Sequence, residues 1–291
     1  MRRILTVIIA VAVIGIGANR VLYAITGNFV KDFEHPFVGL AVFYDSSGEF
    51  SHRCSGSLLS PHVFLTAGHC VFGVSSARVY FQQDAGAHYD PATQQDPVSG
   101  YPDDCFTQPC TTGRKLISFG YAGQFLLPNT QDAGLVILDH AIDLPEYGAL
   151  AEAGSLDALA SRRGLQSVTF TDSGYGLSYT NPATTVSYRE RLMVTSKLDN
   201  LSSALNDGFN VQTSNSPGIG GGTCFGDSGG PLFYGASSSN TIVGVTSFGL
   251  SSNVCAGTDF AYRTDRQAVI NWILTNAGRE AKQIAVVPLQ P

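Results

Sequence analysis

Charged side chains are scarce in this sequence of 291 residues, where they make up 14% of the total and acidic residues outnumber basic ones by 23 to 17. No cluster of lysine and arginine follows the N-terminus, so the basic surface that a nucleic-acid-binding protein needs is not indicated. No two cysteines form a CxxC pair, which argues against a structural zinc site. The sequence therefore predicts no nucleic-acid partner, no metal and no cofactor.

Long apolar runs are also missing. The longest, from Ile4 to Ala18, falls short of the roughly 18 or more residues expected of a membrane-spanning helix. A basic start at residues 1–3, this apolar middle and the small residues Ala18 and Ala24 are typical of a signal peptide. We therefore predict that residues 1–24 are a signal peptide, with cleavage after Ala24 or after Ala18, and that the mature protein is extracellular and not stably bound to a membrane.

What is abundant is glycine, with 32 copies, and this favours many short strands joined by tight turns over long solvated helices. Strand-sized apolar or alternating runs are separated by clusters of turn-forming residues, as expected of a sandwich or barrel. These runs are 37–44, 63–66, 79–81, 134–138, 167–170, 231–234 and 241–248. The first expectation is an all-β protein.

Two segments depart from this pattern. The polar stretch 82–113 is interpreted as a surface insertion; its acids Asp84, Asp90, Asp103 and Asp104 are typical of a solvated loop and not of a calcium site. Residues 264–267 have the form of a capping box, and an apolar face follows it, which predicts one C-terminal helix over about 265–277. The tail 278–291 has no assigned role.

The six cysteines all follow the export segment, and an even count in an exported chain indicates three disulfides, for which about 15 pairings exist. They are Cys54, Cys70, Cys105, Cys110, Cys224 and Cys255.

The strongest chemical signal is the glycine-flanked serine in the segment from Gly226 to Pro231. Glycines here allow a sharp turn, expose the Ser228 hydroxyl and let a substrate carbonyl approach backbone N–H groups. The same letters fit a plain glycine-rich turn and also the nucleophile elbow of α/β-hydrolases. That class requires a histidine after the serine, and it is excluded because all six histidines precede Ser228; the order His, Asp, Ser stays open.

Two further segments fit that order. His69 lies in Thr66-Ala-Gly-His-Cys70, at the end of an apolar strand and beside a cysteine. Asp132 is the first residue of Asp-Ala-Gly-Leu-Val-Ile-Leu. The rivals for these places are His62 for the histidine, and Asp104 and Asp139 for the carboxylate. Together with Gly226-Asp-Ser-Gly-Gly-Pro, these segments resemble the three signature segments of chymotrypsin-like (trypsin-type) serine peptidases. The resemblance covers about residues 25–273.

The resemblance implies two packed six-stranded antiparallel β-barrels with a C-terminal helix, the first over about 25–144 and the second over about 145–263, in one domain of residues 25–291. It implies that Ser228 is the nucleophile, His69 the general base and Asp132 the residue that orients it. The N–H groups of Gly226 and Ser228 would form the oxyanion hole. The expected function is a monomeric secreted endopeptidase acting on proteins or peptides. The rivals are a catalytically silent binding scaffold and a serine esterase.

By the same resemblance, Cys54 pairs with Cys70 and Cys224 with Cys255, which leaves Cys105 for Cys110. Segment 247–249 is similar to the family's S-W-G. The substrate-pocket set is thus Ser247, Phe248, Gly249, Gly222 on the floor and Phe260 on the wall, which favours apolar or small side chains.

A shift of one residue would instead place Asp259 in the pocket and favour arginine or lysine.

The segment Ile25-Thr-Gly-Asn28 is similar to the family's I-V-G-G start, whose freed amine pairs with the aspartate before the serine, here Asp227. No basic activation site precedes Ile25, because it follows Ala24. We therefore expect that cleavage after Ala24 during export creates the active N-terminus directly.

Overall fold

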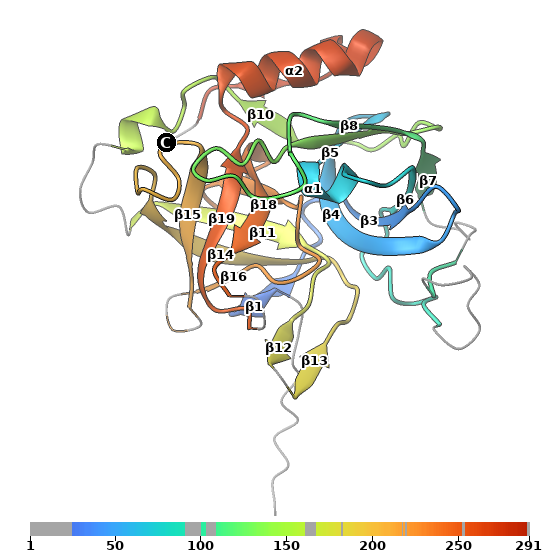
Figure 1. The fold of residues 1–291 in the computed structure, drawn as a ribbon, viewed down its shortest axis with the longest axis horizontal. Helices are drawn as coiled ribbons and strands as arrows, with labels where there is room; N and C mark the ends of the chain where they lie inside the picture. Colours follow the sequence, from blue (N-terminus) through green and yellow to red (C-terminus); the bar gives the residue numbers. More distant parts are fainter. Residues whose placement is uncertain are drawn as a thin grey trace, which may run out of the picture.

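The fold is almost entirely β, as the computed structural model in Figure 1 shows. The structure describes residues 25–90, 100–102, 109–160, 167–181, 183–216, 218, 220–251 and 254–289. The predicted signal peptide, Cys105, Asp103 and Asp104 lie outside these ranges. Within them, no helix is both long and apolar enough to cross a lipid bilayer.

The first sheet has seven strands in the order β7-β6-β3-β4-β5-β9-β8, and every neighbouring pair is antiparallel. Its edge strands β7 and β8 follow each other in the chain with only Arg114 between them, so the sheet curls round into a half-barrel. The strands are β3 (Val38–Tyr44), β4 (Phe50–Ser60), β5 (Val63–Thr66), β6 (Ser76–Tyr80), β7 (Cys110–Gly113), β8 (Lys115–Ser118) and β9 (Gly134–Ile137).

The second sheet closes into a six-stranded barrel because β17 pairs with both β11 and β18. The barrel strands are β11 (Thr169–Gly174), β14 (Leu192–Asn200), β15 (Asn210–Asn215), β17 (Pro231–Tyr234), β18 (Thr241–Gly249) and β19 (Gly257–Arg263). Three short strands add to its outside: β2 (Val30–Lys31), β10 (Ala149–Ala151) and β20 (Val286–Val287). The predicted all-β fold with a C-terminal helix is confirmed; of the two predicted six-stranded barrels, the second forms as a closed barrel and the first as a curled half-barrel of seven strands.

The remaining elements are short. They are β1 (Thr26–Gly27) with its partner β16 (Gly221–Gly222), the hairpin β12 (Tyr179–Asn181) and β13 (Thr184–Val186), α1 (Gly68–Val71), η1 (Asp157–Leu159), α2 (Gln267–Ala277) and η3 (Gly278–Lys282). One cluster of buried apolar side chains runs from Phe43 and Leu65 in the first sheet to Phe233 and Tyr262 in the second, so the two units share a core.

Helix α2 lies along the outside of the molecule and buries its apolar face, including Val269 and Ile273. The predicted capping box does not form. The helix begins after Arg266 without a side-chain cap, because the Thr264 hydroxyl donates to the carbonyl of Ile242 instead. The tail that follows α2 has a structural role that the sequence did not indicate, since β20 pairs in parallel with β10.

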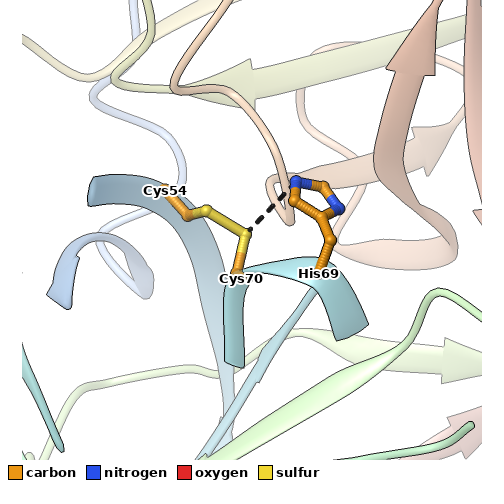
Figure 2. A group of neighbouring side chains, drawn as sticks. All are labelled: Cys54, His69 and Cys70. Carbon is orange, nitrogen blue, oxygen red and sulfur yellow. Dashed lines mark hydrogen bonds between the residues drawn. A yellow bond between two sulfur atoms is a disulfide. The ribbon is translucent and has the colours of Figure 1, made fainter. Parts of the chain in front are cut away.

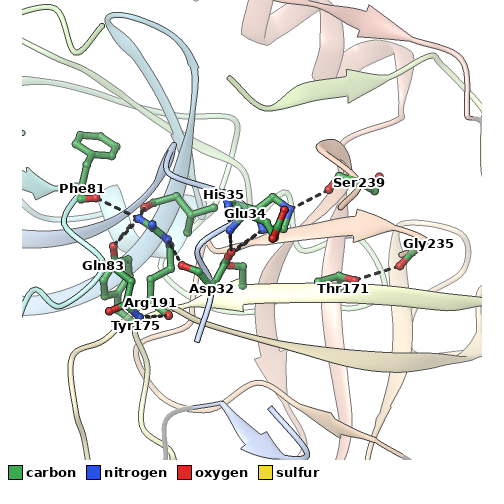
Figure 3. A network of polar contacts seen from close by, with 12 residues as sticks. Asp32, Glu34, His35, Phe81, Gln83, Thr171, Tyr175, Arg191, Gly235 and Ser239 are labelled. Atoms are coloured by element: carbon green, nitrogen blue, oxygen red, sulfur yellow. Dashed lines mark hydrogen bonds and ion pairs between the residues drawn. The ribbon is translucent and has the colours of Figure 1, made fainter. Parts of the chain in front are cut away.

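A buried polar network joins the two β units (Figure 3). Arg191, next to β14 of the barrel and 3% exposed, donates to the carbonyls of Val38 and Phe81 in the first unit and to that of Asp32. Asp32 in turn accepts bonds from the backbone and Nδ1 of His35. Burial alone would raise the pKa of Asp32, but the His35 hydrogen bond and charge hold it below its usual value. The network fixes how the two units meet, and therefore the cleft between them.

Candidate active site

His69 sits on α1, immediately after the buried strand β5. A disulfide between Cys54 of β4 and Cys70 of α1 fixes this turn, with sulfurs 1.99 Å apart (Figure 2). His69 Nε2 lies 3.7 Å from Cys70 Sγ. Both sulfurs are bonded to each other, so this cluster of two cysteines and a histidine serves to position the imidazole and offers no thiolate for a metal.

Asp132 orients the imidazole. The carboxylate is fully buried; its Oδ1 accepts the backbone N–H of His69 at 2.7 Å and its Oδ2 lies 2.9 Å from His69 Nδ1. The hydroxyl of Ser247 donates to the same Oδ2 at 2.5 Å. Because an ionised carboxylate can only accept, Nδ1 carries the proton in this contact and Nε2 is left as the basic nitrogen.

The loop that carries Ser228 packs directly on the segment that precedes His69. Gly226 and Gly229 have positive φ angles of 98° and 78°, which favour glycine. A Cβ on Gly229 would lie 2.6 Å from the backbone N of Ala67, so a larger residue there would force the serine loop away from α1. His69 and Ser228 both line two cavities, each of about 380 Å³.

The backbone around Ser228 presents two N–H groups. Within the described part of the chain, neither the Gly226 N–H nor the Ser228 N–H donates to a protein acceptor. The Phe225 carbonyl accepts the Leu177 N–H at 2.7 Å and the Asp227 carbonyl accepts the Gly230 N–H at 2.8 Å, so the peptide planes that carry the two N–H groups are fixed. This leaves two adjacent donors that a substrate oxygen could use.

The predicted ion pair between Ile25 and Asp227 is not formed in this uncleaved chain, where the Ile25 nitrogen belongs to a peptide bond. The Asp227 carboxylate accepts the N–H groups of Gly176 at 2.7 Å and Cys224 at 2.9 Å instead. Ile25 is fully buried and packs in a cluster with Leu192. The ion pair stays a prediction for a chain cut after Ala24.

Three buried carboxylates crowd the barrel behind this site. Burial, with a smaller contribution from the charge of Asp259, raises the pKa of Asp227 to about 7 and that of Asp172 to about 8. Asp172 Oδ2 has no hydrogen-bond partner among the described residues. The barrel interior near Ser228 therefore carries acids that are costly to ionise.

We expect Asp172 to make the protein less stable as the pH rises. The Asp172 carboxyl is neutral in the folded state up to about pH 8 but ionises near its ordinary pKa of 3.8 in the unfolded state. Its contribution to the free energy of unfolding is therefore complete below about pH 4, falls as the pH rises, and is lost once the pH passes about 8. Asp172→Asn should flatten the decline in the free energy of unfolding between pH 5 and 8, measured by urea denaturation. The exposed control Asp143→Asn should keep the wild-type slope; equal slopes in all three proteins would contradict the assignment.

Of the two cavities beside Ser228, the one that Phe248 lines is the candidate substrate pocket. Ser247, Phe248 and Gly249 line it as predicted, and the Cys224–Cys255 disulfide forms part of its wall. Two predicted members, Gly222 and Phe260, are absent from the lining. Phe260 is fully buried and stacks on Phe248 with ring centroids 4.4 Å apart.

Asp259 lines the pocket in their place. A Cβ on Gly222 would lie 2.5 Å from Asp259 Oδ2, so the carboxylate fills the space beside that glycine. The reason lies in strand geometry: successive side chains of β19 point to opposite faces, so Asp259 and Phe260 cannot both face the pocket. The alternative alignment with Asp259 in the pocket is the one that the structure follows.

The segment between β8 and β9 supplies side chains that the sequence did not single out. The ring of Phe125 lies 5.5 Å from that of His69 and 5.3 Å from that of Phe248, and Tyr121 lies 6.0 Å from His69. Their one sequence signal is an apolar triplet at 125–127 in a turn-rich segment. The third predicted disulfide joins Cys105 to Cys110. Cys110 is disulfide-bonded, and its expected partner Cys105 lies outside the described residues.

Two packed β units, with an aspartate-bound histidine and a glycine-flanked serine facing the same cavities, define the chymotrypsin-like class of proteins. The model of the Trypsin family matches residues 25–273, and the chain belongs to that family.

Known relatives agree with this membership. A chymotrypsin from Phaedon cochleariae is 28% identical over 238 residues, which is 80% of this chain and 75% of the relative. The CLIP domain-containing serine protease B4 of Anopheles gambiae is 26% identical over 260 residues, covering 87% of this chain and 69% of the relative. Human chymotrypsin-like elastase family member 3B is 41% identical over only 69 residues, 23% of this chain and about a quarter of the relative's length (24%).

Solved structures share the fold. HL collagenase has a TM-score of 0.59 at 19% identity, over 87% of this chain and 97% of its own. A scabies mite inactivated protease paralogue, S-D1, also has a TM-score of 0.59, at 15% identity, over 92% of this chain and 100% of its own. Since one of these is an inactivated protein, the fold alone does not establish catalysis.

Proposed function

We propose that this protein is a secreted serine endopeptidase that cleaves peptide bonds through an acyl-enzyme intermediate. The observation that carries the proposal is the arrangement of Asp132, His69 and Ser228. The buried carboxylate holds Nδ1 of the imidazole, whose ring faces the same cavities as the serine. A serine hydroxyl is a weak nucleophile at neutral pH, and an oriented histidine is what activates it.

The proposed reaction begins when a peptide carbonyl lies beside Ser228. His69 Nε2 accepts the hydroxyl proton as Oγ attacks, and Asp132 stabilises the imidazolium that forms. The negative charge on the carbonyl oxygen is bound by the N–H groups of Gly226 and Ser228, each typically worth about 10² to 10³ in rate. His69 then donates its proton to the leaving amine, and water hydrolyses the acyl-enzyme by the reverse sequence.

Extracellular location is part of the proposal. It is supported by the two described disulfides, Cys54–Cys70 and Cys224–Cys255, which form in oxidising compartments, and by the signal-like residues 1–24. Sequencing of the mature N-terminus tests the proposed cleavage during export. A start at Ile25 would supply the amine for Asp227, whereas a start at Asn19 in a fully active protein would rule out this route to the ion pair.

A second candidate function is a non-catalytic binding scaffold, which the inactivated paralogue of the same fold suggests. A fluorophosphonate probe together with casein hydrolysis by the processed protein separates the candidates. The endopeptidase should be labelled on Ser228 and should hydrolyse casein. Labelling without casein hydrolysis would indicate a serine esterase, and the absence of labelling would indicate the scaffold; either result would contradict the proposal.

A further inference from the structure

One arginine of the first β unit reaches across to the second. Arg53 lies on β4, next to the Cys54 whose disulfide fixes the histidine turn, and it lines the cavity of about 380 Å³ that also contains His69 and Ser228. Its Nη1 donates to the Tyr101 hydroxyl at 3.2 Å, within its own unit. Its other hydrogen bonds cross to the second unit, so Arg53 links the two sides of the cleft beside Ser228.

The partners of Arg53 in the second unit are the two ends of one projecting segment. Between β11 and β14 the chain forms the hairpin of β12 and β13, which stands away from the body of the molecule (Figure 1). We call residues 175–181 and 183–187 the hairpin segment. Arg53 donates from Nη1 to the Tyr175 carbonyl at 3.3 Å and from Nη2 to the Ser187 hydroxyl at 2.8 Å. Because a two-stranded hairpin alone is marginally stable, a guanidinium that joins its ends fixes where they lie.

The start of the hairpin segment holds the backbone of the predicted oxyanion hole. The Leu177 N–H donates to the Phe225 carbonyl at 2.7 Å, and this carbonyl belongs to the same peptide group as the Gly226 N–H. The Gly176 N–H donates to the Asp227 carboxylate at 2.7 Å, directly before Ser228. The position of the hairpin segment therefore sets the direction of both N–H groups.

A single peptide group connects Arg53 to Asp227. The carbonyl of Tyr175 accepts from the guanidinium, and the N–H of Gly176, on the other side of the same peptide group, donates to Asp227. Hydrogen bonds in such a chain polarise one another, so the cation strengthens the bond that holds the Asp227 carboxylate. Loss of the guanidinium would weaken that bond and free the ends of the hairpin segment together.

The charge of Arg53 also lies close to the oxyanion backbone. A Cβ on Gly226 would lie 3.6 Å from Arg53 Nε and 3.7 Å from its Cζ. Within the part of the chain that the structure describes, Arg53 takes part in no ion pair. Burial raises the pKa of Asp227 to about 7, and the charge of Arg53 opposes that rise. The cation thus favours the ionised Asp227, which can accept an N–H group on each oxygen.

We propose that Arg53 is a positioning residue for the oxyanion hole. By joining the two ends of the hairpin segment, it keeps the peptide groups that precede Gly226 and Ser228 turned so that both N–H groups face the substrate oxygen. This inference rests on the endopeptidase function proposed above. Because the negative charge on that oxygen exists only in the transition state, a loss of alignment should lower kcat and leave KM nearly unchanged.

The test measures kcat and KM of the processed protein with a chromogenic peptide anilide. Arg53→Met should lower kcat on the order of 10- to 100-fold, less than the loss of a donor, because the N–H groups remain but are misaligned. Arg53→Lys keeps the charge but can reach only one end of the hairpin segment, so it should recover part of the rate. The exposed Arg114→Met should keep wild-type constants. Unchanged kcat in Arg53→Met, a loss confined to KM, or full recovery in Arg53→Lys would overturn the proposal.

A pair of inhibitors shows whether the loss lies at the oxyanion hole. A peptidyl trifluoromethyl ketone bonds to Ser228 and then carries an anionic oxygen, whereas the alcohol of the same peptide does not. In Arg53→Met the inhibition constant of the ketone should rise by about the factor by which kcat falls, and that of the alcohol should change little. Equal weakening of both inhibitors would indicate general damage to the site and would refute the positioning role.

A milder variant keeps the proposal testable if Arg53→Met does not fold. Ser187→Ala removes one bond to the guanidinium and should lower kcat several-fold, and Ser187→Thr, which keeps a hydroxyl, should restore it. Unchanged kcat in Ser187→Ala, or no recovery in Ser187→Thr, would refute the role of Arg53. Fluorophosphonate labelling of the wild type distinguishes the two failures: a labelled protein whose variants keep full kcat refutes only the positioning role, whereas an unlabelled one refutes the peptidase function.

Discussion

Replacing Ser228 with alanine is expected to lower kcat for peptide hydrolysis by about 10⁶-fold, the size of loss found when the nucleophile of a Ser-His-Asp triad is removed. The physical reason is that Ser228 is the proposed nucleophile, so without its hydroxyl attack on the carbonyl reverts to water. Binding should survive, because the pocket walls and the N–H donors are unchanged. The measurement is kcat and KM with a chromogenic peptide, and the loss should fall on kcat.

The size of this effect must be separated from damage to the fold. The exposed Ser237→Ala is the matched control and should retain wild-type rates. His69→Ala should cost about as much as Ser228→Ala, and the double variant should be no slower than either, because residues that act as a unit give strongly non-additive losses. Additive losses in the double variant, or a residual rate above about a hundredth of wild type in Ser228→Ala, would mean that Ser228 and His69 do not act together.

Asp132→Asn is expected to lower kcat by about 10⁴-fold, a figure carried over from the Ser-His-Asp template of this same family. The structure gives the cause for this chain. Asp132 accepts from both the backbone N–H and Nδ1 of His69, and an amide placed there can donate to Nδ1, which would leave the proton on Nε2. The imidazole would then face Ser228 in the tautomer that cannot accept the hydroxyl proton.

Two variants make the Asp132 result specific. Asp139→Asn changes a neighbouring carboxylate that accepts the Thr112 hydroxyl on the surface, and it should leave kcat unchanged. Ser247→Ala removes one donor to Asp132 Oδ2 but keeps both bonds to His69, so its loss should be much smaller than that of Asp132→Asn. Comparable losses in Asp132→Asn and Ser247→Ala would indicate that the carboxylate supports packing and not the tautomer of His69.

The sequence predicted the parts of the site that depend on local structure. His69 follows a buried strand and precedes a cysteine whose disulfide fixes the turn, and Ser228 lies between glycines whose positive φ angles expose it. The histidine turn and the serine turn are each formed by a few consecutive residues, so a short sequence motif is enough to predict their positions. The fold class was predictable for the same reason, since short apolar runs separated by turn residues become strands of curled sheets.

The features that could not be predicted from the sequence depend on strand register and on contacts between residues far apart in the chain. The ladder between β18 and β19 shifts by one residue between Thr246 and Phe248, and such an irregularity decides that Asp259 and not Phe260 lines the pocket. Phe125 reaches His69 from a connection between strands whose course no periodic pattern fixes. The pairing of β20 with β10 joins residues more than a hundred positions apart, and the two-residue strand has no pattern of its own.

A crystal structure of the processed protein after reaction with a peptidyl phosphonate would show whether Ser228 is the nucleophile and His69 its base. We expect a covalent bond from Ser228 Oγ to phosphorus, with His69 Nε2 within hydrogen-bond reach of that oxygen. The phosphonyl oxygen should lie about 2.7–3.1 Å from the N–H groups of Gly226 and Ser228. An adduct on another residue, or an adduct on Ser228 with His69 out of reach and those N–H groups turned away, would contradict these assignments.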